Sequence, residues 1–444
     1  MAEIQRALHR ELFGFAMFDF ANSSYTTVII TVVFCVTFPR LIVGDEPGYR
    51  LGNFLWSASL SASYLIVLLT APLLGAIMDY AASKKMFLFI SYILTVLATA
   101  SLYFVEPGCI ILGMLLIILS NIGFSYSEAF ISSFLPGLGP PSDLGKISGY
   151  AWGLGYVGGL LSTAIVIFAL NANVYTLDNF SNLRLVGPVT GLFFLIFAIP
   201  TFLWVTEKTI PRPKFDGKSY FLIGFDRLKK TLLDILDYKD LIILLSSFFF
   251  AYAGLSIVIS FAFIYGDQVI QWSGNTQVFM FIITQVTAAA GAFLFGFLQD
   301  TWNSKKTYLL TLIVWTVTAC LIYGVFQITD FINKLFSLSL KAEHIFLMIA
   351  TFAGLGLGST QSACRAMVGL FAPNTKAGEF FGLWSLAGRL SSIVGLMALG
   401  VLQAIFGLQK AVLVCSAFFL TALIFIVFLN EERGMKAAHK HNGE

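Results

Sequence analysis

Twelve long apolar runs decide what this chain of 444 residues can fold into. Each run holds about 20 residues or more, which lets a helix cross a hydrocarbon layer about 30 Å thick. The runs are continuous and lack the alternation of barrel strands, so we expect an all-α membrane protein of twelve transmembrane helices. A content of 58% hydrophobic and 11% charged residues agrees with this class. The expected spans lie near residues 12–38, 53–78, 86–105, 108–134, 147–170, 185–205, 241–266, 275–298, 307–328, 344–371, 381–406 and 409–429.

An internal repeat shows how these spans are organised. The stretches Gly75–Lys85 and Gly296–Lys306 share the pattern Gly-x-x-x-Asp-x-x-x-x-Lys-Lys, and each follows an apolar run directly. A repeat at this scale indicates that one half of the fold was doubled. We expect Asp79 and Asp300 to cap neighbouring helix N-termini and the lysine pairs to face lipid headgroups. The gating residues predicted from this repeat are Asp79, Lys84, Lys85, Asp300, Lys305 and Lys306.

The basic residues predict the orientation in the membrane. When alternate loops are assigned to opposite sides, most of the 27 Lys and Arg residues fall on the side that holds both termini and both repeat loops. The positive-inside rule therefore places both termini in the cytoplasm. Short loops favour a bacterial inner membrane, and the absence of a small-residue cleavage site argues against a signal peptide. The net charge of +3 reflects topology, so we expect no nucleic-acid partner.

A basic segment, residues 206–240, separates two predicted six-helix bundles, residues 1–205 and 241–444. Apolar residues at helical spacing within this segment suit a short helix on the membrane surface, and a solvated linker is the open alternative. Small residues recur where spans five and eleven begin, notably Gly149 and Gly382. We expect these glycines to let helices approach closely.

Four stretches resemble one branch of the major facilitator superfamily, the vacuole effluxers, which include fungal autophagy-related amino-acid exporters and bacterial relatives. They are FDFANSSY at Phe18–Tyr25, NIGF at Asn121–Phe124, GKISGYAWGLGY at Gly145–Tyr156 and EFFGLWS at Glu379–Ser385. The resemblance implies alternating access, with helices one, four, seven and ten lining a central cavity. It implies amino-acid efflux for the fungal members only. The chain departs from the branch at Tyr252, which is followed by Ala-Gly where the branch has x-Asp-Gly.

Ionisable residues inside spans are the strongest site candidates, because each is costly in a membrane unless it is paired or hydrated. Asp19, Glu128, Arg365 and Arg389 qualify, and all lie roughly 11 Å from the predicted cytoplasmic ends at about 1.5 Å per residue. Polar neighbours share their helical faces, which indicates a hydrophilic cavity. The predicted substrate-binding residues are Asp19, Asn22, Tyr25, Asn121, Ser125, Glu128, Tyr252, Gln361 and Arg365.

Three roles for the buried charges remain open. The two acids could form a gate with the two arginines, Arg365 and Arg389. Alternatively, Arg365 could bind a substrate carboxylate while Asp19 or Glu128 binds an ammonium group. They could also form a static buried pair. For proton coupling, Glu128 is the first candidate and Asp19 the second, since desolvation raises a carboxyl pKa and the four histidines fall at span ends or in loops.

We therefore predict a monomeric secondary transporter that moves a small polar or zwitterionic solute, most simply amino acids, with proton coupling. We expect no cofactor and no metal, because the chain has no H-E-x-x-H zinc motif, and the same absence argues against a membrane enzyme. The alternative is a membrane protein of this fold that handles lipid or another solute class, or a non-transporting scaffold.

Overall fold

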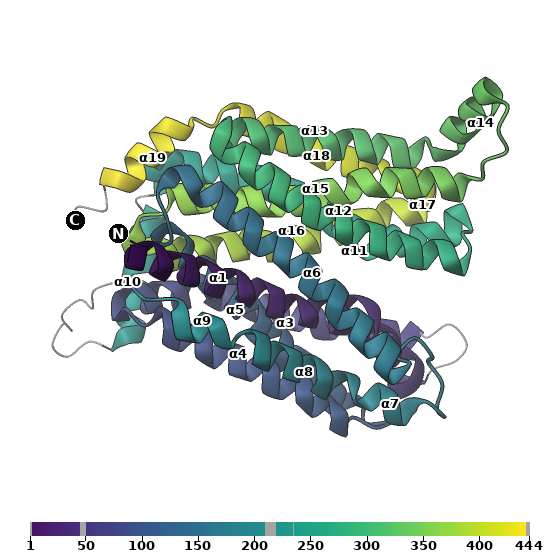
Figure 1. Ribbon diagram of the computed structural model, residues 1–444, viewed down its shortest axis with the longest axis horizontal. Helices are drawn as coiled ribbons and strands as arrows, with labels where there is room; N and C mark the ends of the chain where they lie inside the picture. Colours follow the sequence, from purple (N-terminus) through teal and green to yellow (C-terminus); the bar gives the residue numbers. More distant parts are fainter. Residues whose placement is uncertain (1, 45–49, 209–218, 234, 441–444) are drawn as a thin grey trace. The chain divides into compact units, whose positions relative to one another are not determined.

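The computed structural model describes residues 2–44, 50–208, 219–233 and 235–440, and every regular element within them is a helix (Figure 1). Within these described residues, twelve helical segments are long and apolar enough to cross a membrane, which confirms the predicted number. They agree with the predicted spans to within a few residues at most ends. The segments are His9–Val43, Leu51–Ala81, Lys84–Phe104, Ile110–Gly137, Pro141–Leu170, Phe180–Trp204, Lys239–Tyr265, Thr276–Thr301, Ser304–Tyr323, Ala342–Phe371, Asn374–Gln403 and Leu408–Val427.

The ninth span differs from the prediction at its end. Residues 307–328 were expected to form one run, but helix α13 (Ser304–Tyr323) stops before Gly324 and a separate helix α14 (Val325–Phe336) follows. Gly324 has φ −85° and ψ 11°, which is outside the helical region and turns the chain. Hydropathy alone could not locate this break, because α14 is itself rich in apolar residues.

The chain forms two compact units that are not continuous in sequence. Unit 1 comprises residues 1–140, 154–233 and 372–386, and unit 2 comprises residues 141–153, 234–371 and 387–444. The boundaries fall inside helices α6 (Leu144–Leu170) and α16 (Ala377–Phe406), so the first turns of each belong to a different unit from the rest. The predicted division at residues 206–240 remains a prediction, and residues 209–218 and 234 of that segment lie outside the described residues.

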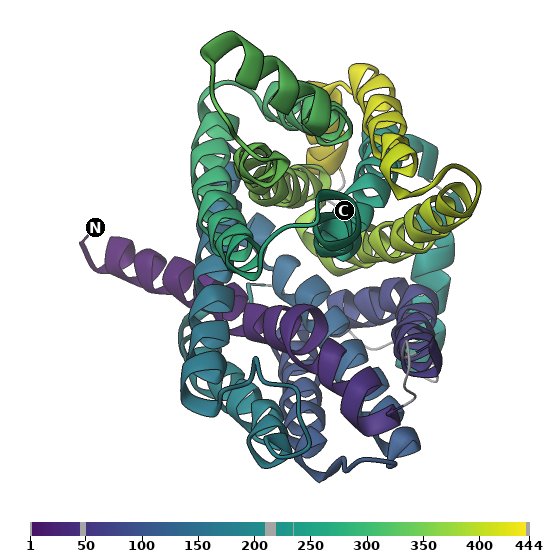
Figure 2. The same ribbon diagram turned by 90° about the vertical axis from the view of Figure 1, so that its right-hand side faces the viewer.

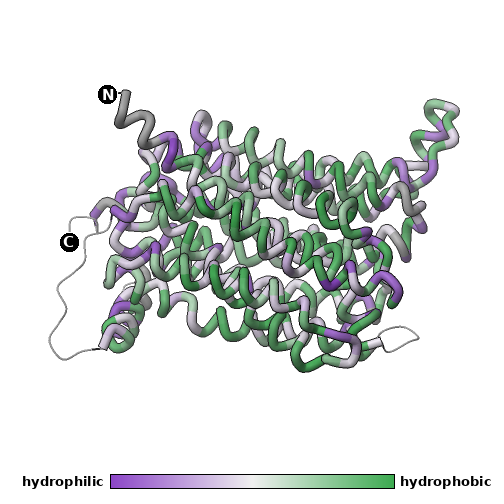
Figure 3. The backbone as a smooth tube through the Cα atoms, turned by 60° about the horizontal axis from the view of Figure 1, so that its bottom comes forward, coloured by the Kyte–Doolittle hydropathy of each residue, from purple (hydrophilic) through white to green (hydrophobic). Residues whose placement is uncertain are grey.

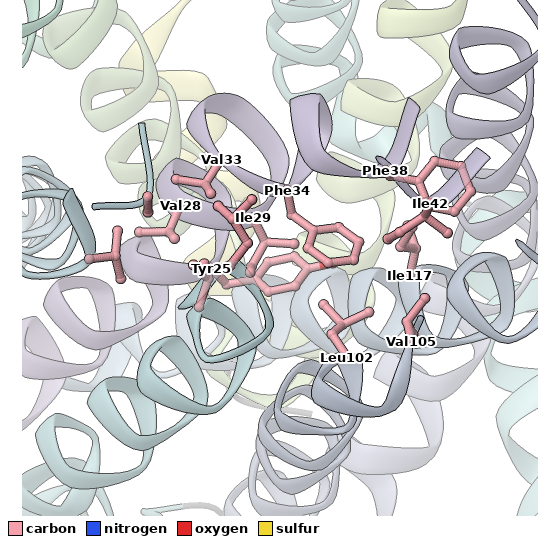
Figure 4. Packing of buried hydrophobic residues seen from close by; sticks show 14 of the residues in the cluster. Tyr25, Val28, Ile29, Val33, Phe34, Phe38, Ile42, Leu102, Val105 and Ile117 are labelled. Atoms are coloured by element: carbon pink, nitrogen blue, oxygen red, sulfur yellow. The ribbon is translucent and has the colours of Figure 1, made fainter. Parts of the chain in front are cut away.

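Unit 1 packs its spans around an apolar cluster. Its long helices include α1 (Ala2–Ser24), α3 (Arg50–Ala81), α4 (Lys84–Ser101), α5 (Ile110–Ser132) and α8 (Val186–Phe197), with the short α7 (Phe180–Arg184) and α9 (Ile199–Trp204). Figure 4 shows the cluster, in which side chains of span one such as Ile29 and Phe38 meet Leu102 and Ile117 from neighbouring helices. Apolar burial of this kind fixes the end of span one that lies away from the repeat loop.

Span one is not a regular α-helix. After α1 come a π-helix, η1 (Tyr25–Val32), a single α turn, α2 (Phe34–Thr37), and a second π segment, η2 (Phe38–Val43). The widened turns leave carbonyls for side chains, and the Tyr175 hydroxyl donates to Val32 O at 3.0 Å. Nothing in the sequence analysis pointed to this irregularity, although π segments often mark functional sites.

Unit 2 is held by close helix packing at glycines. Its long helices are α11 (Lys239–Tyr265), α12 (Gly274–Thr301), α13, α15 (Ala342–Phe371) and α18 (Leu413–Val427), with the shorter α14, α17 (Leu408–Ala411) and α19 (Glu431–Lys440). Helices α12 and α15 run side by side (Figures 1 and 2). A Cβ on Gly358 would lie 1.9 Å from Ala288 O, and one on Gly291 would lie 2.3 Å from Leu355 O. Both positions therefore require glycine.

Apolar residues run along the spans and hydrophilic residues collect near their ends (Figure 3). The predicted helix between spans six and seven is present as α10 (Tyr220–Leu233), which a short 3₁₀ helix, η6 (Ile235–Tyr238), connects towards α11. At the other end of α11 lies η7 (Gly266–Ile270), a third π segment.

Candidate functional site

The first repeat loop caps the start of α16. The Asp79 carboxylate is 3% exposed, and its Oδ2 accepts a hydrogen bond of 3.1 Å from the backbone N–H of Glu379. Glu379 lies in the first turn of α16, whose amide groups have no partner within the helix. Lys84 Nζ lies 3.5 Å from Asp79 Oδ1 and balances its charge.

The second repeat loop caps the start of α6 in the same way. Asp300 Oδ1 and Oδ2 accept hydrogen bonds of 2.8 Å from the backbone N–H groups of Gly145 and Lys146. Anionic groups are favourable there because of the helix dipole and the free amides. Both contacts confirm the predicted capping, and the gating role stays a prediction.

Glycines bring the capped helices against the repeat helices. A Cβ on Gly75 would lie 2.1 Å from Gly378 O, and a Cβ on Gly149 would lie 2.5 Å from Ala292 O. A Cβ on Gly382 would lie 2.7 Å from Pro72 Cα. The prediction that Gly149 and Gly382 serve close packing is therefore confirmed.

The repeat lysines correct the expectation that they face headgroups. Lys84 is 5% exposed and its Nζ donates to Ser133 O at 3.1 Å. Lys85 Nζ donates to Val205 O at 3.0 Å. These ammonium groups satisfy carbonyls at helix ends, where cations are favourable. Lys305 behaves likewise, and the side chain of Lys306 is exposed.

Lys85 belongs to a cluster that joins spans one, three and six. We call this cluster the unit 1 clasp (Glu11, Lys85, Val205, Thr206, Glu207 and Lys208). Glu207 accepts hydrogen bonds from the backbone N–H groups of Lys84 and Lys85, at 2.8 and 3.3 Å. Glu11 Oε1 accepts from the N–H and the hydroxyl of Thr206, and Lys208 Nζ donates to Glu11 Oε2 at 3.1 Å.

Unit 2 contains a matching cluster, the unit 2 clasp (Asp240, Lys305, Val427, Leu429, Asn430, Glu431 and Arg433). Glu431 accepts from the backbone N–H of Lys305 at 3.1 Å, and Lys305 Nζ donates to Val427 O and Leu429 O, each at 2.7 Å. Asp240 accepts from the N–H of Asn430 and from the guanidinium of Arg433, at 2.6 to 2.8 Å. This hydrogen bond raises the pKa of Arg433.

Sequence reasoning missed both clasps. Their signal is a second repeat, in which a polar residue followed by Glu comes directly after spans six and twelve, Thr206-Glu207 in one copy and Asn430-Glu431 in the other. Each copy faces an acid at the start of the first or seventh span, Glu11 or Asp240. The matched contacts extend the evidence for doubling from the repeat loops to the ends of the bundles.

One contact of unit 1 has no counterpart among the described residues of unit 2. Glu379 has a side chain with no solvent exposure. Arg227 Nε of α10 donates to its Oε1 at 2.8 Å, and Arg227 Nη2 forms an ion pair with the same oxygen at 2.8 Å. The Thr231 hydroxyl donates to Oε2 at 2.6 Å, and Arg227 Nη2 also donates to Thr375 O. The residue that corresponds to Glu379 after the second repeat is Lys146, which is partly exposed and pairs with Asp143.

Arg365 is held by the first turns of α6 within unit 2. The side chain is 1% exposed, and its Nε and Nη2 donate to Oγ and O of Ser148, each at 3.0 Å. The guanidinium carbon lies 5.3 Å from the centre of the Trp152 ring, a cation–π distance. The Ser148 hydroxyl in turn donates to Ser362 O at 2.8 Å. These bonds tie α15 to the beginning of α6.

The two acids lie in unit 1, on α1 and α5, and both side chains are half-buried. Asn22 lies three residues after Asp19 on α1, and Ser125 lies three residues before Glu128 on α5. Asn22 is 5% exposed and Ser125 is fully buried. Within the part of the chain that the structure describes, Asn22 Oδ1 and Ser125 Oγ have no hydrogen-bond partner. Native proteins satisfy most buried polar atoms, so these two acceptors require an explanation.

Other predicted substrate residues have partners inside their own unit. Tyr25 is fully buried, hydrogen-bonded to Ser120 Oγ at 2.9 Å and stacked on Phe124. Asn121 Nδ2 donates to Ser63 Oγ at 2.6 Å. Two further substrate candidates lie in unit 2: the Tyr252 ring packs on Phe248 at 5.1 Å, and Gln361 donates to Leu357 O. The gating candidate Arg389 also lies in unit 2 and is 9% exposed.

Comparison with known proteins agrees with these features. The family described as "Vacuole effluxer Atg22 like" matches residues 54–439. The MFS-type transporter YxiO of Bacillus subtilis (strain 168) is 24% identical, over 97% of both chains. Autophagy-related protein 22-1 of Aspergillus niger is 24% identical over 66% of this chain, and the matched part spans about half (48%) of that fungal protein.

Solved structures of the major facilitator superfamily share the fold. The proton:xylose symporter XylE matches 98% of this chain and 99% of its own, with a TM-score of 0.76 at 14% identity. A bacterial homologue of the iron transporter ferroportin matches 95% of this chain with a TM-score of 0.67. YxiO and XylE are transporters and not enzymes. The chain therefore belongs to the vacuole effluxer Atg22-like family, and it is a multi-pass membrane transporter of the major facilitator type.

Proposed function

We propose that this transporter moves amino acids or similar small zwitterionic solutes, and that unit 1 recognises their ammonium group. The supporting observation is the pair of buried acceptors, Asn22 Oδ1 and Ser125 Oγ, beside the half-buried carboxylates of Asp19 and Glu128. An ammonium group carries three donors and one positive charge, so it complements such a set of acceptors. A buried acceptor without a donor costs about 1–3 kcal/mol, which a bound ammonium group would recover.

We propose that Arg365 acts in gating and not as the carboxylate ligand. Two of its donors already serve Ser148, and its ring contact with Trp152 covers the guanidinium. These bonds engage Nε and one N–H of Nη2, so the side of the guanidinium that carries Nε already serves the protein and a bidentate fork on that side would displace Ser148. Arg389 and the repeat-loop residues Asp79 and Asp300 share this proposed gating role.

We propose further that a proton on Glu128 or Asp19 is coupled to transport. A carboxylate in a partly dehydrated site responds strongly to opening and closing, because desolvation favours its neutral form. The predicted orientation, with the repeat loops and both termini in the cytoplasm of a bacterial inner membrane, belongs to the same proposal.

Binding can be tested with chemically matched ligands. The purified protein is titrated with amino acids, with their amides, which lack the carboxylate, and with their N-acetyl derivatives, which lack the ammonium group. We expect the amino acids and the amides to raise the melting temperature and the N-acetyl derivatives to have no effect. Equal stabilisation by the N-acetyl derivatives would contradict recognition of the ammonium group.

Transport is tested in vesicles by counterflow of radiolabelled amino acids. We expect Ser125→Ala to reduce counterflow at least tenfold, corresponding to about 1.4 kcal/mol of lost binding. For Glu128→Gln, counterflow should persist while uptake driven by a pH gradient is lost. If the wild-type protein moves no small solute in this assay, a scaffold or lipid-handling role becomes the better explanation.

A further inference from the structure

Helix α10 lies across the ends of two spans. Its residue Gly224 meets Ile77 of α3 so closely that a Cβ would lie 2.4 Å from Cγ1, and the Tyr220 ring packs 6.3 Å from the ring of Tyr80. Its later turns reach the first turn of α16 through Arg227. Because successive turns contact the ends of two different spans, the helix crosses these ends and does not continue either one.

The inner face of α10 is fully occupied. Ile223 is 6% exposed and Thr231 is 1% exposed, and the latter donates to Glu379. Ile223, the half-buried Arg227 and Thr231 are spaced four apart, which places them on one side of the helix. This side accounts for the attachment of α10 and leaves the opposite side to other contacts.

The outer face of α10 is apolar although the helix is not a span. It has only 14 residues and includes charged side chains, so it is too short and too polar to cross a bilayer. Large apolar side chains are normally covered on a helix of this kind. The exposed ones are Phe221 (59% exposed), Leu222 (54%), Phe225 (55%) and Leu233 (72%).

Basic residues accompany this apolar face. Lys229 and Lys230 are both exposed, and Asp226 is the one acid of the helix. Lysines beside Phe and Leu are typical of helices that lie in the headgroup layer, where apolar side chains reach the acyl boundary and ammonium groups meet phosphates. Each lysine near an anionic surface contributes about 1 kcal/mol, or about a fivefold change in binding.

We propose that the outer face of α10 is a docking surface for the anionic phospholipid bilayer. Phe225 and its apolar neighbours enter the interface, and Lys229 and Lys230 bind headgroup phosphates. The inner face meanwhile stays bound to α3 and α16. This surface does not depend on the identity of the solute, so it can fail or stand independently of the proposed function.

Hydrogen exchange in lipid nanodiscs tests the surface. The whole chain of 444 residues is placed in discs of phosphatidylcholine, alone or with increasing phosphatidylglycerol, and exchange of the 220–233 amides is measured. We expect phosphatidylglycerol to slow this exchange by about 25-fold, about fivefold for each lysine. The double variant Lys229→Glu/Lys230→Glu should lose that effect, and Phe225→Ser should speed exchange in both lipids.

Controls separate this effect from misfolding. Lys334→Glu makes one such Lys-to-Glu change on the exposed lysine of α14 and should leave exchange of α10 unchanged. Amides of α12 report in every sample whether the bundle is intact, and the milder Lys229→Gln/Lys230→Gln replaces the glutamate variant if that one unfolds. Equal exchange of wild-type α10 in both lipids overturns the proposal, and so does a phosphatidylglycerol effect that survives loss of both lysines.

Discussion

Replacing Glu379 tests how strongly α10 holds the start of α16. The carboxylate is fully buried and accepts from Arg227 and Thr231, while the Glu379 backbone donates to Asp79. Glu379→Gln removes the charge and keeps the shape, so the guanidinium is left without its counter-ion. Arg227→Met removes the other partner and keeps an unbranched side chain.

The magnitude follows from the 2.8 Å separation between Arg227 Nη2 and Glu379 Oε1, with side chains 14% and 0% exposed. At an effective dielectric constant near 20 this distance gives an attraction of ~6 kcal/mol, most of which offsets desolvation. Breaking such a pair on one side costs about 3–5 kcal/mol. We expect the lower end, about 3 kcal/mol, because loss of the Glu379 charge also relieves its repulsion with Asp79.

The assay is a double-mutant cycle on the free energy of unfolding in detergent, followed by tryptophan fluorescence. We expect each single variant to lower the free energy of unfolding. The double variant Glu379→Gln/Arg227→Met should lower it by less than the sum of the two single losses, and the difference should be at least about 2 kcal/mol. Lys146→Met is the matched control, since Lys146 takes the corresponding place in the other copy with a side chain 36% exposed, and should cost less than about 1 kcal/mol. Additivity of the two single effects within about 0.5 kcal/mol would refute the buried pair.

Three further predictions concern packing, capping and binding. Gly75→Ala places a Cβ 2.1 Å from a backbone oxygen of α16 and should cost at least about 3 kcal/mol in thermal unfolding, whereas Gly400→Ala, with nothing within 4 Å, should be neutral or stabilising by up to about 1 kcal/mol. Asp300→Asn leaves one carbonyl oxygen for two amides and should cost about 1–2 kcal/mol in the same measurement; an unchanged melting temperature would contradict the cap. Ser125→Ala should leave stability unchanged or higher while counterflow falls, because its oxygen has no partner among the described residues. Ser120→Ala, which removes the bond to the Tyr25 hydroxyl, should lower stability by about 1 kcal/mol, and the reverse pattern for these two serines would count against a substrate role for Ser125.

The spans and the capping aspartates were predictable because hydropathy and an exact spacing carry their signal. The pattern around Asp79 repeats around Asp300, and the identical spacing indicated that each aspartate contacts the same kind of neighbour, the N-terminus of a helix. The partners of the repeat-loop lysines were not predictable in this way, since a cation after a span suits a lipid phosphate and a helix C-terminus equally well. Which one Lys85 contacts depends on the position of Val205, which lies 120 residues away.

The candidate site was predictable as a set of polar residues, but their partners were not. Helical spacing placed Asn22 beside Asp19 on one face, yet only packing separates a satisfied side chain such as Asn121 from an unsatisfied one such as Asn22. The clasps were missed because each joins residues from three spans. Their sequence signal, Glu after a polar residue, is too short to be recognised without its partners.

The π-helix of span one has a consequence for how this helix can change. Each residue of an α-helix advances by about 100°, and an i to i+5 turn holds one residue more than an α turn. If one turn of η1 (Tyr25–Val32) tightened into an α turn, every residue beyond it would rotate by about one position. Phe34 and Phe38 would then present a different side to their neighbours, while Asp19 and Asn22 kept theirs. Such a change in η1 would therefore rotate the aromatic end of the span relative to its charged part.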